Sequence, residues 1–343
     1  MPDPDPAFPR QSPPEAAFVE VTPVPSVVAT IRPPGSKSLT NRALTCAAFA
    51  RGESVLTGAL RSEDTEVMIA ALREVGVTIE VSEGGRRLVV DGSNRQPVDT
   101  EAKPLDLFIA NSGTTVRFLT AALSAAGGNY RLHGVRRMHE RPIVDLVRAI
   151  EGVIDGRIWC ESAAGCPPVH IESRGWRSAD VNVSGSVSSQ YLSGLLMAAP
   201  ISQSSGLSQS TRSAVDPDVV RISVAGELVS RPYVTMTTRV MQAFGAEIEV
   251  IRDAPIDAAD LRFDISSKGY RSTQYEIEPD ASAASYFWAV AAITGGSITV
   301  EGLSADAMQG DVGFCEVLQS MGCQVEYRTD AITVTGAPLH GID

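Results

Sequence analysis

The stretch 31-IRPPGSKSLTNRALTCAAFARGESVLTGAL-60 contains the pattern that decides the fold. A run of small and polar residues comes first, followed by an Ala- and Leu-rich segment, a glycine and a short apolar stretch. The Ala/Leu segment is typical of a buried helix, and a glycine followed by alternating apolar residues is typical of a helix end and a strand start. The stretch therefore predicts one helix packed on one strand.

This pattern occurs four times along the chain. The copies start 75, 74 and 95 residues apart, and they are 42-RALTCAAFARGESVLTGAL-60, 117-RFLTAALSAAGGNYRLHGV-135, 191-YLSGLLMAAPISQSSGLSQS-210 and 286-YFWAVAAITGGSITVEGL-303. A second helix and strand pair follows each copy, at 67–81, 144–160, 240–250 and 317–327. Each copy is therefore a β/α unit of two helices packed on one sheet, and the fold class is α/β (α+β) with repeated units.

Length and charge limit the class of protein. A chain of 343 residues that is 43% hydrophobic can bury more than one core, because single cores stop growing at roughly 250 to 300 residues. The net charge of −12 and the pI near 4.9 argue against DNA or RNA as a partner. Any anion that binds here is expected to be small and held by local cations.

Cysteine, histidine and apolar content point to a cytoplasmic chain without a metal. The five cysteines form no C-x-x-C pair and the four histidines are scattered, so we expect neither a disulfide framework nor a metal site. No signal peptide and no bilayer-spanning apolar run is evident, so we expect no membrane contact. Ten of the 21 prolines fall within the first 34 residues, which predicts a disordered tail over residues 1–26.

Short polar segments precede the first helix of every unit: 35-GSKSLTN-41, 111-NSGTTV-116, 184-SGSVSSQ-190 and 280-DASAAS-285. Two interpretations are open. The residues can be ordinary N-caps, for which Ser, Thr, Asn and Asp are preferred. They can also surround a ligand that takes the backbone N–H groups at the helix start.

Cations in the first of these segments favour a ligand. A helix N-terminus carries about half a positive charge, so Lys37 there costs a few tenths of a kcal/mol, up to about 1, unless an anion compensates it. Arg42 lies four residues after Ser38, on the same helical face. This convergence predicts a phosphate site, while the absence of the first P-loop glycine argues against a nucleotide triphosphate. A second basic group is 136-RRMHERP-142, whose alternative interpretation is a solvated loop.

Seven motifs in order resemble the EPSP synthase family, the 3-phosphoshikimate 1-carboxyvinyltransferases. They are PPGSKSLTNRAL, NSGTTVRFLTAAL, RRMHERPI, SGSVSSQYLSGLLMAAP, LVSRPYVTMT, EPDASAASYF and MQGD, and the match runs from about residue 27 to the last residue. The resemblance implies a two-lobed enolpyruvyl transferase fold, with pseudo-threefold lobes of β/α units. It implies a partial first lobe at 27–36 and 278–343, and a second lobe with three repeats at 37–277.

The resemblance also implies a reaction. The family transfers the enolpyruvyl group of phosphoenolpyruvate to the 5-hydroxyl of shikimate 3-phosphate, releases phosphate, and needs no metal or organic cofactor. The implied partners are these two small molecules, with no nucleic acid and no membrane, and the implied state is a cytoplasmic monomer of the shikimate pathway, which leads to chorismate and the aromatic amino acids.

Site residues follow from the resemblance position by position. Lys37 matches a catalytic lysine that touches both substrates. The matched positions that bind shikimate 3-phosphate include Ser38, Arg42, Ser188, Ser189, Gln190, Ser230 and Tyr233. The matched positions around phosphoenolpyruvate are Gly113, Thr114 and Arg141, with Gln190 nearby. Capping remains the alternative for Ser188, Ser189 and Ser230, and packing is the alternative for Tyr233.

The sequence departs from the family pattern in two ways. Phe118 replaces a common proline, and the sequence reads NSGTT where NAGTA is common, which puts glyphosate sensitivity in doubt. The family also has six units, whereas four are found here. This leaves open a non-catalytic fragment that binds shikimate 3-phosphate without turnover. A transferase acting on UDP-N-acetylglucosamine is a further alternative, although RRMHERPI replaces that relative's cysteine-containing loop.

Overall fold

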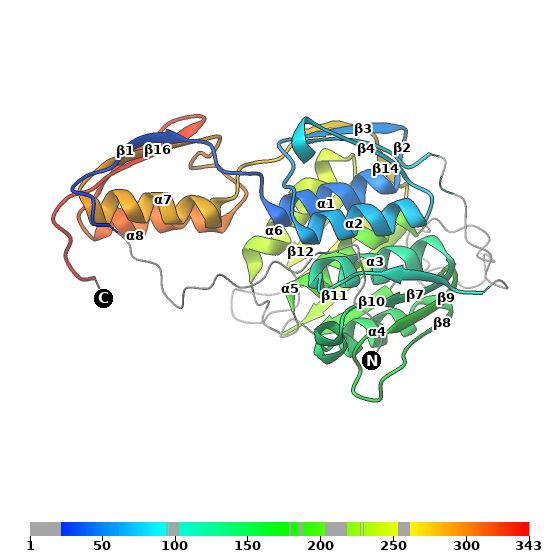
Figure 1. The fold of residues 1–343 in the computed structure, drawn as a ribbon. Coiled ribbons are helices and arrows are strands. Elements are labelled where there is room, and N and C mark those ends of the chain that lie inside the picture. The colour runs from blue at the N-terminus through cyan, green and yellow to red at the C-terminus, as the bar shows by residue number, and fades with distance from the viewer. Residues whose placement is uncertain are drawn as a thin grey trace.

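The chain forms two bodies joined by two extended segments (Figure 1). In this computed structural model, the larger body comprises residues 37–277, and the smaller body combines residues 28–31 with 281–335. Each body has its own hydrophobic cluster. The structure describes residues 22–93, 95, 103–177, 180–184, 188–202, 218–226, 228, 230–252 and 261–342. Most of the predicted tail, residues 1–21, lies outside this description.

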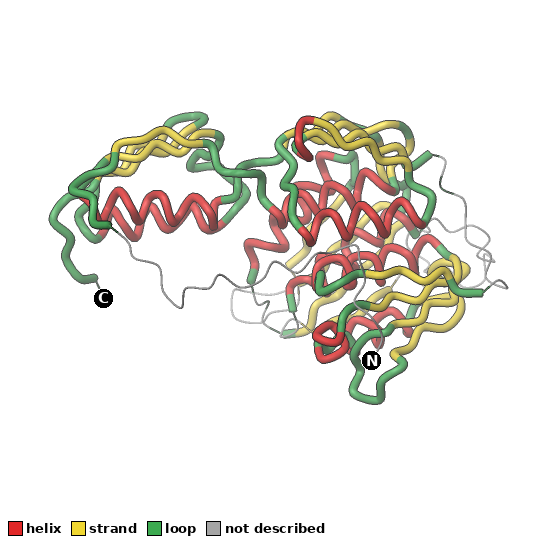
Figure 2. The backbone as a smooth tube through the Cα atoms, viewed as in Figure 1, coloured by secondary structure: helices red, strands yellow, loops and turns green. Residues whose placement is uncertain are grey.

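One unit, with one sheet topology, occurs four times. The first and second strands of each sheet are parallel, and the fourth strand lies between the second and the third and is antiparallel to both. The predicted repeat of β/α units with two helices each is therefore confirmed. Figure 2 shows the helices of the larger body enclosed by its sheets, and those of the smaller body on one side of its single sheet.

Three units make the larger body. Unit A consists of α1 Lys37–Ala48, β3 Glu53–Thr57, α2 Glu63–Glu74, β4 Thr78–Ser82, β5 Arg87–Asp91 and β15 Gln274–Glu276. Unit B consists of β6 Leu105–Phe108, α3 Gly113–Ala126, β7 Gly128–His133, α4 Val144–Glu151, β8 Ile154–Cys160 and β9 Val169–Trp176. Unit C consists of β10 Asp180–Ser184, α5 Ser189–Ala198, β11 Val219–Ala225, α6 Arg231–Ala243, β12 Ile248–Arg252 and β13 Leu261–Ser266.

The smaller body is a fourth unit. Unit D consists of β1 Val28–Ile31, α7 Ala281–Thr294, β16 Ser297–Glu301, α8 Phe314–Ser320, β17 Gln324–Tyr327 and β18 Ala331–Thr335. A separate two-stranded parallel sheet in the larger body pairs β2 Ala50–Arg51 with β14 Tyr270–Arg271. Four short 3-10 helices complete the described elements, at Glu83–Gly85, Arg136–Glu140, Ala199–Ile201 and Gly310–Gly313. Within the described part of the chain, no helix is long and apolar enough to cross a bilayer.

Units A and D have exchanged their first strands. β1 pairs with β16 of unit D but leads into α1, whereas β15 pairs with β3 of unit A but leads into α7. The two crossing segments bond to each other, because Ser36 N donates to the Glu278 carbonyl and Asp280 N to the Pro34 carbonyl, at 2.9 and 2.8 Å. Any side chain on Gly35 would run into the backbone of Gly58, so the glycine is required by this close passage.

Some predicted boundaries were wrong. The second helix of unit C begins at Arg231 rather than at residue 240, because Pro232 is favourable in a first helical turn although the following Thr and Val residues are weak helix formers. The strand predicted within 191–210 falls largely on residues 203–210, outside the described residues. Among the described residues, the strand of unit C that follows α5 is Val219–Ala225.

Candidate functional site

The first helix of the larger body begins beside two carboxylates. Lys37 is the first residue of α1, and its Nζ lies 3.3 Å from Asp64 Oδ2 in the first turn of α2. Its backbone N–H donates to Asp280 Oδ2, at the start of α7, over 3.4 Å. Ser36, the N-cap of α1, makes no side-chain cap bond. The cation that the sequence left without a partner is therefore compensated in part by Asp64, which sequence reasoning missed.

Arg42 is buried between three helices. Its Nε donates to Thr237 Oγ1 on α6 at 2.8 Å, and its NH2 donates to Ser193 Oγ on α5 at 3.2 Å. Its NH1 donates to the Ser38 carbonyl at 2.9 Å, which confirms that residues 38 and 42 share a helical face. The guanidinium carbon lies 5.3 Å from the ring centre of Phe118 and 5.9 Å from that of Tyr233.

The environment of Arg42 contains dipoles instead of counter-charges. Burial lowers the pKa of Arg42 to about 10, and the arginine is only 2% exposed. A group with that pKa still carries its proton at neutral pH. Among the described residues it forms no salt bridge, since its partners are two hydroxyls and one carbonyl. Arg42 is therefore a buried cation whose charge is solvated but not neutralised.

Two further arginines, Arg117 and Arg141, lie at the start of α3. A Cβ added to Gly113 would lie 2.5 Å from Arg117 NH1 and 2.6 Å from Arg141 Cζ, so both guanidinium groups approach this glycine. Arg117 NH1 donates to the Gly113 carbonyl at 3.0 Å, and Arg141 NH1 to the Asn111 carbonyl at 3.0 Å. Burial lowers the pKa of Arg117, and the nearby Arg141 charge lowers it further. Two like charges held this close favour an anion between them.

Gln190 links this pair to the start of α5. Its Oε1 accepts from Arg117 NH1 at 2.8 Å, and the guanidinium lies 5.4 Å from the ring centre of Tyr191. Arg117 Nε is buried without a hydrogen-bond partner in the described part of the chain. Ser188 is the N-cap of α5, and its hydroxyl oxygen accepts from the Gln190 N–H at 3.4 Å, a contact that does not use the hydroxyl proton. Ser189 is the first residue of α5 and is half-buried.

The start of α6 differs from an ordinary cap. Ser230 has φ 60° and ψ 51°, in the left-handed region, and its side chain makes no cap bond. A non-glycine residue in this region costs of order 1 kcal/mol or more and is often found at functional sites. Tyr233 is 40% exposed, and its ring centre lies 5.9 Å from the guanidinium carbon of Arg42. Thr114, the second residue of α3, is half-buried.

The structure thus brings the predicted residues to the starts of four helices in one body, α1, α3, α5 and α6. Sequence reasoning missed Arg117, Ser193 and Thr237. A sequence signal for Arg117 was available, because it follows Gly113 by four residues as Arg42 follows Ser38. In the structure each arginine donates to the carbonyl four residues earlier. Ser193 and Thr237 lie within the motifs SGSVSSQYLSGLLMAAP and LVSRPYVTMT, but the sequence analysis gave neither residue a role.

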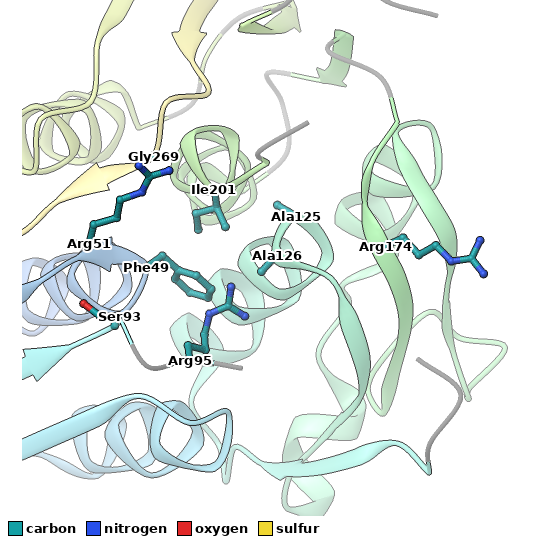
Figure 3. A pocket seen from close by; sticks show the side chains of 11 residues that line it. Phe49, Arg51, Ser93, Arg95, Ala125, Ala126, Arg174, Ile201 and Gly269 are labelled. Carbon is teal, nitrogen blue, oxygen red and sulfur yellow. The ribbon is translucent and has the colours of Figure 1, made fainter. Parts of the chain in front are cut away.

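A cavity at the opposite ends of these helices is a different kind of feature. It encloses about 360 Å³ and is lined by Phe49 at the end of α1, Ala126 at the end of α3 and Ile201 beyond α5. Figure 3 shows Arg95 beside Phe49, while the Arg174 side chain points away from them. The Arg95 guanidinium lies 4.8 Å from the Phe49 ring centre. Cations are favourable at helix C-termini, so these arginines do not require an anion.

Fold and site define a class: an α/β protein of repeated units that gathers cations, hydroxyls and helix N-termini at one place. A sequence model of the family EPSP synthase (3-phosphoshikimate 1-carboxyvinyltransferase) matches residues 21–343. The chain belongs to the EPSP synthase family.

Relatives and solved structures agree with this family. The chain is 46% identical over 307 residues to 3-phosphoshikimate 1-carboxyvinyltransferase of Bordetella petrii, covering 88% of this chain and 63% of the relative. It is 39% identical over 330 residues to the chloroplastic enzyme of that name from Arabidopsis thaliana, covering 94% and 60%. The solved EPSP synthase of Acinetobacter baumannii shares the fold, with a TM-score of 0.72 at 24% identity, covering 92% and 66%. The chain thus spans about 60% of the length of the plant relative.

Proposed function

We propose that this chain binds shikimate 3-phosphate and phosphoenolpyruvate at the helix starts of the larger body. We propose further that it acts in transfer of the enolpyruvyl group to the 5-hydroxyl of shikimate 3-phosphate, giving EPSP and phosphate. The observation that carries the proposal is the set of three arginines, Arg42, Arg117 and Arg141. Within the described residues none of them has a carboxylate partner.

Two small polyanions suit such a site. Each substrate carries one phosphate and one carboxylate, and a guanidinium can bind either group through two parallel N–H donors. We assign Arg141, Gly113 and Thr114 to phosphoenolpyruvate, because the absence of a side chain at Gly113 lets Arg117 and Arg141 both approach the start of α3. We assign shikimate 3-phosphate to the residues around Arg42 and the starts of α5 and α6, namely Ser38, Ser188, Ser189, Gln190, Ser230 and Tyr233.

Lys37 is the residue to which we assign a catalytic role. Its side chain is 47% exposed. The salt bridge from its Nζ to Asp64 Oδ2, at 3.3 Å, is therefore partly exposed to solvent. Such pairs are worth about 1 kcal/mol or less, so the ammonium can leave Asp64 for a substrate anion at little cost. The reaction protonates the methylene carbon of phosphoenolpyruvate and adds the 5-hydroxyl oxygen to the central carbon, with loss of the hydroxyl proton. Phosphate is then expelled together with a proton from the new methyl group, which restores the methylene. A cation beside both reactants would stabilise the charge that develops on the phosphate and carboxylate oxygens.

We also infer the organisation of the working protein. The larger body would be one lobe and the smaller body part of the other, with the crossing segments 32–36 and 277–280 between them. The starts of α1 and α7 meet at this junction, where the Lys37 N–H donates to Asp280. Substrates bound there would contact both lobes. We infer a monomer that works in the cytoplasm without a metal or organic cofactor.

The test combines calorimetry with a phosphate-release assay. Calorimetry is expected to show that shikimate 3-phosphate binds the wild-type chain, and that Lys37→Met and Arg42→Met each reduce the binding enthalpy. UDP-N-acetylglucosamine is expected not to bind. Phosphate release with both substrates would establish transfer by this chain alone. Binding without release would support the binding half of the proposal and contradict transfer, and the absence of binding would overturn both halves.

Arg141→Lys separates the two substrate positions. Loss of a charge-assisted contact costs about 1.5 to 3 kcal/mol, or roughly tenfold to a hundredfold in affinity. The substitution keeps the charge but loses the planar fork, so phosphoenolpyruvate should be weakened and shikimate 3-phosphate hardly affected. Equal weakening of both substrates would contradict the role given to Arg141.

A further inference from the structure

The buried cation Arg42 is held by two hydroxyl residues from two other helices. Thr237 on α6 accepts from Arg42 Nε at 2.8 Å, and Ser193 on α5 accepts from NH2 at 3.2 Å. These hydroxyls are coupled, because Thr237 Oγ1 lies 2.8 Å from Ser193 Oγ and 2.7 Å from the Tyr233 carbonyl that accepts its proton. Both residues are fully buried. One network therefore ties α1, α5 and α6 together through a single guanidinium.

The chemistry of this network is unusual for a buried arginine. Burying a charge is costly unless it is paired and hydrogen-bonded, and carboxylates are the usual partners. Here the partners are hydroxyls and the Ser38 carbonyl, which solvate the cation and leave its charge in place. A carboxylate in the same position would satisfy the guanidinium equally well but would cancel the field that attracts an anion.

The network also fixes the orientation of the guanidinium. Of the five N–H groups of an arginine, three are donated to Thr237, Ser193 and Ser38, so one remains on each terminal nitrogen. The rings of Phe118 and Tyr233 lie 5.3 and 5.9 Å from the guanidinium carbon. Tyr233 is part-exposed, so it connects the buried cation with the surface where α6 begins.

We propose that Thr237 and Ser193 are positioning residues, which hold Arg42 as an oriented and un-neutralised cation for an anionic group of the substrate. This inference rests on the proposed function, because it takes shikimate 3-phosphate as the anion. Thr237 and Ser193 themselves need not touch the substrate. Their effect is transmitted through Arg42, and that dependence can be measured.

The first experiment is a double-mutant cycle on the full chain, with shikimate 3-phosphate binding followed by calorimetry. Thr237→Val removes the hydroxyl at nearly constant volume and is expected to weaken binding about tenfold. In an Arg42→Met background the same substitution is expected to change binding less than twofold, because the group through which it acts is gone. Thr237→Ser keeps the hydroxyl and should bind within about twofold of the wild type.

Thr238→Val is the matched control. Thr238 is the next residue on α6, and its hydroxyl donates to the Thr235 carbonyl and not to Arg42. It should leave binding unchanged. Equal weakening by Thr237→Val in both backgrounds would show a merely structural role and overturn the inference, and so would no weakening in either. If the wild type fails to bind shikimate 3-phosphate, the proposed function falls and the inference falls with it, so the two failures are distinguishable.

A second pair of variants tests the charge argument and does not depend on the stability of Thr237→Val. Ser193→Asp and Ser193→Asn are nearly isosteric and differ in a carboxylate that would pair with Arg42. Ser193→Asp is expected to bind shikimate 3-phosphate at least tenfold more weakly than Ser193→Asn, while melting at no lower temperature. Equal binding by the two variants would show that the charge of Arg42 is not used, and would overturn the inference.

Discussion

Helices α3 and α7 occupy the same place in units of the same topology, yet they are buried very differently. Twelve of the 14 residues of α3 are buried, whereas only five of the 14 residues of α7 are. On α7 the side chains of Tyr286 and Ile293 are 75% and 78% exposed, and Val290 between them is 38% exposed. α7 contains no charged residue and is at least as apolar as α3, so the difference in burial comes from the surroundings of the two helices.

This difference shows what the surroundings contribute to a repeated unit. α3 packs against α1 and α5 of the neighbouring units, while α7 packs against its own sheet and α8. A helix that is apolar all round is normally buried on every side. Apolar residues at positions 286, 290 and 293 follow helical spacing, so α7 carries a second apolar face that the smaller body does not cover.

The largest effect that this comparison predicts is on stability. Leu119 of α3 is fully buried, so Leu119→Ala should lower the free energy of unfolding by about 2 to 5 kcal/mol. Ile293→Ala on the exposed face of α7 should change it by no more than about 0.5 kcal/mol. Urea denaturation followed by circular dichroism measures both. A large loss with Ile293→Ala would mean that the face of α7 is covered in solution.

The second prediction compares the glycine at the start of α3 with the glycine at the end of α7. Gly113→Ala at the start of α3 would push a methyl group into Arg117 and Arg141, so phosphoenolpyruvate binding should weaken by roughly tenfold to a hundredfold. Gly295 ends α7 with φ 65° and has no neighbouring atoms within 4 Å of an added Cβ. Gly295→Ala should therefore cost about 1 kcal/mol of stability and leave binding unchanged. Calorimetry with both variants makes the test, and unchanged binding by Gly113→Ala would remove Gly113 from the site.

The apolar face itself gives a third, smaller effect. Replacing Tyr286 and Ile293 by lysine should reduce the fluorescence of a bound hydrophobic dye by about half, because contiguous apolar patches bind such dyes. Stability should change by no more than about 0.5 kcal/mol. The matched control replaces Val81 and Val250, which are 45% and 49% exposed on separate strands of the larger body. If that control lowers dye fluorescence equally, the face of α7 has no special role.

Much of the repeat could be predicted from the sequence, because Ala/Leu-rich helices followed by glycine are local signals. The exchange of β1 and β15 between units could not be predicted from the repeat, since strand pairing depends on residues more than 200 positions apart. The strands β5, β9, β13 and β18 were also missed. Each follows another strand of its sheet and not an α-helix, so the helix-then-strand pattern did not include it.

The site shows a similar division. Lys37, Arg42 and Gly113 were predicted as site residues because they stand in short motifs at helix starts. Asp64, Ser193 and Thr237 were not, because each meets its partner on another helix, and the motifs that contain Ser193 and Thr237 do not indicate that contact. The partner of a buried charge depends on packing, and a single sequence does not record it.

The smallest effect that we predict concerns the pH dependence of stability. It contrasts Glu161, in an ion-pair network of the larger body, with Glu326, in a single ion pair of the smaller body. Hydrogen bonds from Arg131 and His170 lower the pKa of Glu161 to about 2, and the Arg328 hydrogen bond lowers the pKa of Glu326. A carboxyl with a lowered folded-state pKa contributes stability above its ordinary pKa, and this contribution is lost as the pH falls. For Glu161 the loss runs from about pH 4.5 toward pH 2.

Glu161→Gln should therefore flatten the pH dependence of the free energy of unfolding between pH 5 and pH 3. Because Glu161 is 40% exposed, we expect a difference of less than about 1 kcal/mol. Glu326→Gln should have a smaller effect, since that carboxylate is fully exposed to solvent and has one partner instead of two. Urea titrations of the wild type and both variants at pH 7, 5 and 3 make the comparison. If Glu326→Gln flattens the pH dependence of the free energy of unfolding more than Glu161→Gln does, the two partners of Glu161 do not make its ion pairs stronger than the single pair of Glu326.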